Sequence, residues 1–284
     1  MVAIENGSSF TGATRYVLDE ELANIVNISM ALEMPLLLKG EPGTGKTMLA
    51  HAIAENLQMP LIVLNVKSSM KLVDALYQYD TLTRLNDSRF SDSGRDVSNI
   101  EEYIRMGKIG QAFTAEKRTV LLIDEIDKAD TDFQDDMLDV LDQMEFDIIE
   151  IDKTKAALNR PVIIITSNAK KDLSDPFLGR CNFHHIAFPD PKMMRKIIRV
   201  HFPSLDTELM ENAIETFYGL RDVDAIEKRP ATRELINWIR ALDADPDFKP
   251  KKLVKGKVPF LGVLFKKSQD YGRVLQHTER RRLF

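Results

Sequence analysis

Gly40-Glu41-Pro42-Gly43-Thr44-Gly45-Lys46-Thr47 has the full GxxxxGK[ST] spacing of a phosphate-binding loop. The apolar run Pro35-Leu36-Leu37-Leu38 before it predicts a buried strand. After it, Leu49, Ile53 and Leu57 recur at helical spacing. The loop is therefore predicted to join a strand to the N-terminus of a helix, which is the setting that its chemistry requires.

The glycines and the lysine of this loop give it its expected chemistry. Gly40, Gly43 and Gly45 permit backbone angles that are closed to other residues, so successive N–H groups can turn inward around a β-phosphate. The helix dipole favours the negative charge. Lys46 would reach the β- and γ-phosphates of ATP, and the Thr47 hydroxyl would bind Mg²⁺. A glycine turn that binds nothing is the alternative, which the flanking strand and helix disfavour.

A second candidate part of the site is Val120-Leu121-Leu122-Ile123-Asp124-Glu125, an apolar run that ends in two acids. Such a run predicts a central strand, whose C-terminal end lies at the edge where ligands of open α/β sheets bind. Asp124 would bind Mg²⁺ together with Thr47, and Glu125 would polarise the attacking water. The predicted nucleotide-binding set is Gly40, Glu41, Pro42, Gly43, Thr44, Gly45, Lys46, Thr47, Met48 and Asp124.

A further buried strand is predicted at Val162-Ile163-Ile164-Ile165-Thr166, and Ser167 and Asn168 follow it. An Asn at this edge can hydrogen-bond the attacking water or the γ-phosphate. An Asn that only ends a strand would need no such role. The position of Asn168 after the two phosphate-site strands favours the functional interpretation.

Composition and charge limit the remaining possibilities. The chain has 284 residues, is 44% apolar and contains one cysteine, which excludes a disulfide framework and a cysteine zinc cluster. With no leader-like start and no long apolar run, we expect a cytoplasmic protein without membrane insertion. Residues 249–284 carry seven Lys and four Arg against one Asp and one Glu, although the whole chain is net −5. This segment could bind nucleic acid, an anionic membrane or an acidic partner, or could lie on the acidic body of its own subunit or a neighbour.

The chain is expected to form an α/β domain with a parallel sheet between helices, followed by a small all-helical lid. Residues 1–15 are polar and predicted to be a flexible lead-in. The nucleotide-binding domain is predicted at 16–190, the lid at 191–265 and an exposed basic tail at 266–284. Between Ser68 and Phe113 the pattern is broken and suggests a functional insertion, and 146–155 suggests a small hairpin.

Together, Gly40 to Thr47, Val120 to Glu125 and Ile163 to Asn168 resemble Walker A, Walker B and sensor 1 of the AAA+ ATPases, with a P-loop NTPase core. The resemblance covers roughly residues 16–265. Leu122-Ile123-Asp124-Glu125-Ile126-Asp127-Lys128-Ala129 is especially similar to the MoxR branch of that superfamily, as is a small hairpin before sensor 1.

The resemblance implies roles for two arginines. Arg180, in Leu173-Ser174-Asp175-Pro176-Phe177-Leu178-Gly179-Arg180-Cys181, matches the arginine finger that reaches the γ-phosphate bound by the adjacent subunit. A surface arginine at a helix end is the alternative for that residue. Arg233 resembles the sensor 2 residue of the lid, with Arg229 as a rival for that role.

The function implied by the resemblance is hydrolysis of ATP with Mg²⁺ by a homo-oligomeric, hexameric ring. Glu125, Lys46, Asn168, Arg180 and Arg233 would be its catalytic residues. MoxR-like proteins are chaperones that mature or activate protein complexes, often with partners that carry a von Willebrand factor A domain. A nucleic-acid remodelling ATPase, such as a clamp loader or helicase loader, and a nucleotide-gated scaffold with little turnover are the alternatives.

Overall fold

The structure is a computed structural model that describes most of the chain in two compact units. The described residues are 9–13, 16–90, 94–168, 171, 173–224, 226–245, 253 and 258–280, with side chains described up to 276. The first unit comprises Met1–Ala13, Leu18–Gly40 and Lys46–Ile186, and the second Thr14–Val17, Glu41–Gly45 and Ala187–Phe284.

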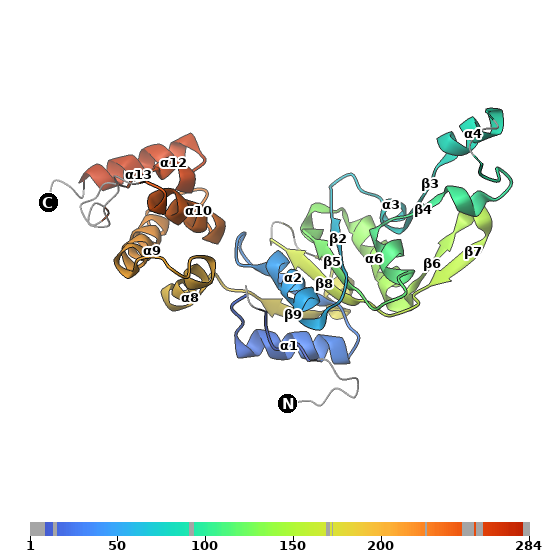
Figure 1. Cartoon of the computed structure of the whole chain (residues 1–284), viewed down its shortest axis with the longest axis horizontal. Coiled ribbons are helices and arrows are strands. Elements are labelled where there is room, and N and C mark those ends of the chain that lie inside the picture. The colour runs from blue at the N-terminus through green and yellow to red at the C-terminus, as the bar shows by residue number, and fades with distance from the viewer. Residues whose placement is uncertain are drawn as a thin grey trace. The chain divides into compact units, whose positions relative to one another are not determined.

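The first unit is built on a five-stranded sheet in which every pair of neighbouring strands is parallel. The strand order is β2-β5-β8-β1-β9, so β8 lies between β1 and β5 (Figure 1). The loop after β1 and the acids at the end of β5 therefore flank the end of β8 at one edge of the sheet. The five strands are β1 (Leu36–Lys39), β2 (Leu61–Asn65), β5 (Val120–Asp124), β8 (Val162–Ser167) and β9 (Asn182–His185).

Helices cover the sheet because nearly every residue of its central strands is apolar and buried on both faces. On one face Leu37, Ile123 and Ile165 form a cluster with Phe113 and Met137. Elsewhere α1 packs on β1 and β9, and α2 packs on β2, β5 and β8. The predicted α/β fold, with a parallel sheet between helices, is confirmed. Helices of this unit are α1 (Glu20–Ala31), α2 (Lys46–Leu57), α3 (Leu72–Leu76), α4 (Thr81–Arg89), α5 (Lys108–Phe113), α6 (Thr131–Gln143) and α7 (Asp175–Gly179), with short 3-10 turns at Ile100–Tyr103, Ile126–Lys128 and Ile149–Ile151.

Two antiparallel hairpins extend from this unit, and together with α4 they are called the hairpin arm (Figure 1). The first joins β3 (Tyr77–Tyr79) to β4 (Ile104–Met106), and the second joins β6 (Glu145–Ile148) to β7 (Lys153–Ala156). The Ile149 N–H donates to the Tyr77 hydroxyl at 3.1 Å, and the rings of Tyr77 and Phe146 stack with centroids 6.3 Å apart. The broken region therefore contains an antiparallel strand pair, and the hairpin expected within 146–155 is confirmed, although β6 begins one residue earlier and β7 ends one residue later.

Gly110 of α5 lies so close to α3 that a side chain cannot fit. A Cβ added there would lie 2.1 Å from the carbonyl oxygen of Leu76. Gly110→Ala is expected to lower the free energy of unfolding by about 2 kcal/mol, because overpacking against backbone cannot be relieved by a rotamer change. Differential scanning calorimetry measures the effect. Gly179→Ala is the control, since a Cβ at Gly179 meets no atom within 4 Å. Equal melting temperatures for the two variants would contradict the close contact.

The second unit is a helical bundle around Trp238, whose indole N–H donates to the Pro259 carbonyl at 2.7 Å. Val274 is fully buried in the same core. The exposed basic tail predicted at 266–284 is wrong in part: Ser268–Arg280 form a helix in which Asp270 and Val274 are buried, while most of the other described side chains from 266 to 276 are exposed. Residues 281–284 lie outside the described part. The helices are α8 (Pro191–His201), α9 (Thr207–Arg221), α10 (Thr232–Asp243), α12 (Leu261–Leu264) and α13 (Ser268–Arg280).

The predicted flexible lead-in is wrong at Phe10, which is 1% exposed. Its backbone N–H donates to Asn27 Oδ1 at 2.7 Å, and Asn27 Nδ2 donates to its carbonyl at 3.1 Å. This pair of bonds ties residue 10 to α1, so the segment is ordered where an aromatic side chain can be buried. Residues 1–8, 14 and 15 lie outside the described part. Within the described part, no helix combines the length and apolar character needed to cross a bilayer.

Candidate ATP and magnesium site

The loop between β1 and α2 has the backbone conformation that its sequence predicts. Gly43 has φ 81° and Gly45 has φ 95°, in the left-handed region that favours glycine. The helix begins at Lys46, which is 6% exposed and whose Nζ donates to the Gly40 carbonyl at 2.8 Å. The Thr44 hydroxyl donates to the carbonyl of Glu41 at 3.0 Å. A glycine-rich loop at a helix N-terminus with a buried lysine is suited to bind a polyphosphate.

Thr47 and Asp124, which are predicted to share Mg²⁺, lie side by side. The Thr47 hydroxyl in the first turn of α2 donates to Asp124 Oδ1 at 3.0 Å. Asp124 is the last residue of β5, so a helix and a strand each contribute one side chain, and the two meet at the carboxyl edge of the sheet. Hydroxyl and carboxylate oxygens are the ligands that Mg²⁺ prefers, and this pair fits the ion.

Glu125 directly follows β5 with φ 60° and ψ 51°, a left-handed conformation that is uncommon for a residue with a side chain. Its Oε1 accepts from Asn168 Nδ2 at 2.9 Å, and its Oε2 accepts from the Lys128 ammonium. The hydrogen bond and the charge of Glu125 raise the pKa of Lys128 above its ordinary value. The carboxylate is therefore held from two sides at the edge of the sheet.

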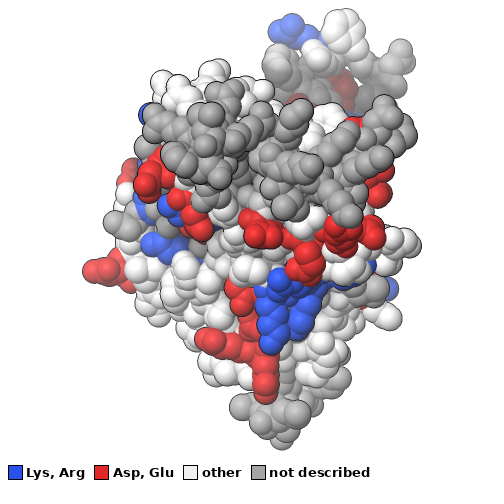
Figure 2. Space-filling view, turned by 90° about the vertical axis from the view of Figure 1, so that its left-hand side faces the viewer, with Lys and Arg blue, Asp and Glu red and all other residues white. Residues whose placement is uncertain are grey.

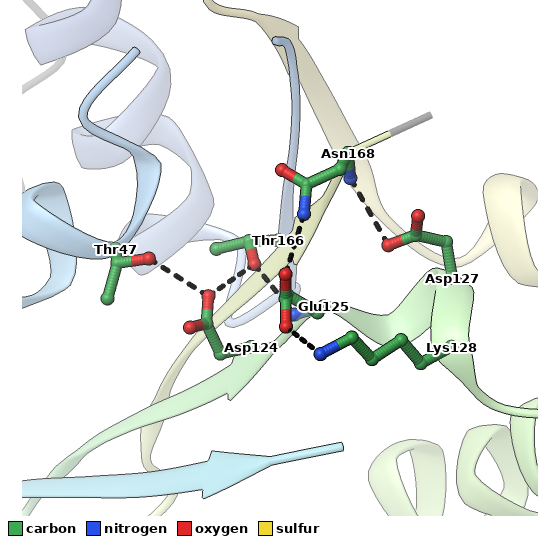
Figure 3. A network of polar contacts seen from close by, with 7 residues as sticks. All are labelled: Thr47, Asp124, Glu125, Asp127, Lys128, Thr166 and Asn168. Atoms are coloured by element: carbon green, nitrogen blue, oxygen red, sulfur yellow. Dashed lines mark hydrogen bonds and ion pairs between the residues drawn. The ribbon is translucent and has the colours of Figure 1, made fainter. Parts of the chain in front are cut away.

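Asn168 reaches Glu125 because β8 lies between β1 and β5. Its backbone N–H donates to Asp127 Oδ1 at 3.2 Å, and Asp127 is 2% exposed. Asn168 and Glu125, which were predicted to orient and polarise the attacking water, are thus hydrogen-bonded to each other. Figure 3 shows this pair beside Thr47 and Asp124.

Three residues of this network carry no role in the sequence prediction: Thr166, Asp127 and Lys128. Thr166 donates to Asp124 Oδ1 at 2.6 Å and accepts from the Glu125 backbone N–H at 2.9 Å (Figure 3). A polar residue near the end of an otherwise apolar strand is the one signal that could have found it. Asp127 and Lys128 lie in the 3-10 turn after Glu125, and only the fold shows which neighbours they contact.

Arg180 lies outside the network of Figure 3. It directly follows α7, and its Nε lies 2.5 Å from Asp142 Oδ2 on α6. Both side chains are well exposed, at 41% for Arg180 and 46% for Asp142. The ion pair of Arg180 is thus with Asp142 on α6 and not with Asp124 or Glu125.

The two sensor 2 candidates belong to the second unit. Arg233 is exposed in the first turn of α10, and Arg229 is exposed in the segment before it. Neither residue is distinguished by its burial, so the assignment of sensor 2 stays a prediction. Of the other predicted binding residues, Glu41 and Pro42 are exposed, and the Met48 side chain is 47% exposed at the first turn of α2.

Comparison with known proteins agrees with this geometry. The family described as "ATPase family associated with various cellular activities (AAA)" matches residues 36–189, more than half of the chain. The chain belongs to this AAA family. Membership implies ATP hydrolysis at the level of the family. The matched residues include the loop, both acids and Asn168.

One protein with a similar sequence and one with a similar structure extend the comparison of this AAA protein. The ATP-dependent zinc metalloprotease FtsH of Acholeplasma laidlawii (strain PG-8A) is 28% identical over 182 residues. That match covers 58% of this chain but 23% of the relative, so the chain spans about a quarter of its length. A RuvB mutant from Thermotoga maritima has a similar structure, with a TM-score of 0.55 and 17% identity, over 84% of this chain and 69% of that one. This second likeness concerns the fold alone.

Proposed function

We infer that this AAA protein is a Mg²⁺-dependent ATP hydrolase of the MoxR type, which works as a hexameric ring and remodels, matures or activates a protein complex. One observation carries the proposal of ATP hydrolysis. Thr47, Asp124, Glu125 and Asn168 come from three separate segments of the chain and share one hydrogen-bonded network. These are the residue types needed to bind the metal and to orient a water molecule.

Each member of the site has a distinct task in this proposal. Lys46 binds the β- and γ-phosphates, and Thr47 and Asp124 hold Mg²⁺. The ion neutralises the negative charge that develops on the phosphates. Glu125 accepts the proton of the attacking water, and its hydrogen bond with Asn168 fixes the direction in which the carboxylate points.

Lys46→Ala is expected to weaken ATP binding on the order of 100-fold, since the ammonium makes charge-assisted bonds to phosphate worth about 3 kcal/mol. Isothermal titration calorimetry with a non-hydrolysable ATP analogue and Mg²⁺ measures the change. Lys267→Ala is the control, because Lys267 is 50% exposed and pairs with Glu227. If both variants bound the analogue as the unmodified protein does, the loop would not be the nucleotide site.

The proposed ring rests on Arg180, which is exposed and pairs with Asp142 of its own chain. An arginine supplied by a neighbour would complete the site only at a subunit interface. The ATPase rate per subunit is therefore expected to rise with protein concentration, in parallel with the mass measured by analytical ultracentrifugation. Full activity in a strictly monomeric sample would contradict the ring.

The proposed protein partner finds support in the hairpin arm. Leu82 is 75% exposed, Phe90 70% and Ile149 82%, so large apolar side chains are open to contact on α4 and near the tip of the second hairpin. The partner can be captured with Glu125→Gln in the presence of ATP, followed by identification of what co-purifies. Recovery of a protein that carries a von Willebrand factor A domain would support the MoxR-like assignment, and recovery of unrelated proteins only would oppose it.

A nucleic-acid remodelling function has less support. On the face shown in Figure 2, the described Lys and Arg side chains stand next to Asp and Glu. Among the described residues, Arg195 pairs with Glu211 and Lys267 pairs with Glu227. ATPase activity that DNA stimulates in a salt-dependent manner would favour this alternative.

A nucleotide-gated scaffold with little turnover is the other alternative. In that case the unmodified protein would have almost no ATPase activity, and Glu125→Gln would not change it.

A further inference from the structure

The hydroxyl of Thr166 is the point where the two acids of the site are joined. Thr166 is fully buried at the second-to-last position of β8. Its Oγ1 donates to Asp124 Oδ1 at 2.6 Å and accepts from the Glu125 N–H at 2.9 Å. The same Asp124 oxygen accepts from Thr47 at 3.0 Å. A chain of three hydrogen bonds therefore connects the loop helix to the peptide that leads into Glu125 (Figure 3).

The backbone explains why a side chain is needed at this place. Regular pairing of β5 with β8 ends at Ile123 and Ile165, so the next residues along, Asp124 and Thr166, are joined through the hydroxyl. Immediately beyond, Glu125 adopts its left-handed conformation, which costs about 1–3 kcal/mol and persists only where the surroundings enforce it. The bond from the Glu125 N–H to Thr166 is one such restraint.

We propose that Thr166 is a positioning residue that couples the metal-binding carboxylate of Asp124 to the orientation of Glu125. Removal of its hydroxyl would free the Asp124 carboxylate to rotate and leave the Glu125 N–H without its acceptor. Mg²⁺-dependent binding of ATP and the rate of turnover should then fall together. The inference rests on the proposed function of the same site, and goes beyond it by assigning the residue that aligns the two acids.

Thr119 provides a matched control for this hydroxyl. It precedes the first residue of β5 and is 1% exposed, but its Oγ1 has no hydrogen-bond partner. Thr119→Val and Thr166→Val thus remove the same atom from equally buried sites of one sheet layer. Only the second removes hydrogen bonds to the acids. A general effect of losing a buried hydroxyl would appear in both variants.

The test measures the dissociation constant of a fluorescent ATP analogue with saturating Mg²⁺ and in EDTA. For Thr166→Val, the gain in affinity that Mg²⁺ provides is expected to shrink about tenfold, as one hydrogen bond to a charged group would give. The constant in EDTA should stay within about twofold of the unmodified protein, since the phosphate loop is untouched. Thr166→Ser keeps the hydroxyl and should restore the gain, and Thr119→Val should retain it.

The outcomes separate this inference from the proposed function. A Thr166→Val protein with an unchanged Mg²⁺-dependent gain would overturn the role of Thr166 and leave the ATP site standing. An unmodified protein that binds no ATP analogue would instead overturn the proposed function. If Thr166→Val gives no cooperative thermal melt, Thr166→Ala removes the same hydroxyl with less volume and is used in the same assay. If Thr166→Ser showed the same loss as Thr166→Val, the assignment to the hydroxyl would be overturned, because serine keeps the hydroxyl and the site would then respond to any change of side-chain shape.

Discussion

Arg180→Ala is expected to lower kcat for ATP hydrolysis by about 10³-fold or more, while the dissociation constant for ATP changes by less than about threefold. An arginine finger stabilises charge that exists only in the transition state, so its loss leaves ground-state binding intact. Arg180 is free to act in this way because its bond to Asp142 is an exposed ion pair, worth less than about 1 kcal/mol. The measurement is steady-state ATPase activity together with equilibrium nucleotide binding.

Subunit mixing makes this expectation specific to an arginine that acts on a neighbour. In mixtures of Arg180→Ala with Lys46→Ala, some interfaces combine an intact Lys46 with an intact Arg180, so part of the activity should return. Arg195→Ala is the matched control, because Arg195 is 44% exposed and its Nε also binds a carboxylate, that of Glu211. A fully active Arg180→Ala variant would end the shared-site model. Loss of activity without recovery on mixing would place the role of Arg180 within its own subunit.

Glu125→Gln is expected to reduce turnover by about 10²–10⁴-fold and to retain ATP binding. Glutamine has nearly the shape of glutamate and can still accept a hydrogen bond from Asn168, but it cannot take a proton from water. The variant should therefore hold ATP without hydrolysing it. Single-turnover measurements with radiolabelled ATP separate the slow chemical step from binding.

The control for this variant is Glu227→Gln, a glutamate that is 47% exposed and pairs with Lys267 at 2.7 Å. It should hydrolyse ATP at the unmodified rate. A Glu125→Gln protein that kept more than a tenth of the activity would show that another group accepts the proton. Asp127 would then be the next residue to test, since it contacts the backbone of Asn168.

The sequence could predict the loop, the two acids and Asn168 because each belongs to a short local pattern. Gly40 to Thr47 is contiguous, and each of the other groups ends a strongly apolar run. The arrangement of these groups in the sheet follows from the pairing of parallel strands. Thr166 was missed because its partners lie 41 and 42 residues away in the chain, and only the register of β5 with β8 reveals them.

Helix α4 and the C-terminal helix could not be predicted from the sequence, for different physical reasons. In α4, no residue is buried, so no apolar stripe marks this helix in the sequence. Near the C-terminus, the high charge of 266–284 suggested an exposed tail. Val274 of α13 is nevertheless fully buried and belongs to the core of the helical unit. Many charged residues in a segment predict that one face of it is exposed. They do not predict whether a single apolar residue on the opposite face is buried.

The central position of β8 has a consequence for the newborn chain. Until residues 162–167 leave the ribosome, β1 and β5 have no strand to separate and align them, and their ends must stand about 10 Å apart, two strand spacings, in the finished sheet. The acids of the proposed ATP site therefore do not have their final positions when only the first half of the chain has been translated. Under the proposed function, nucleotide would stabilise this protein only after the strand that carries Thr166 has been inserted between β1 and β5.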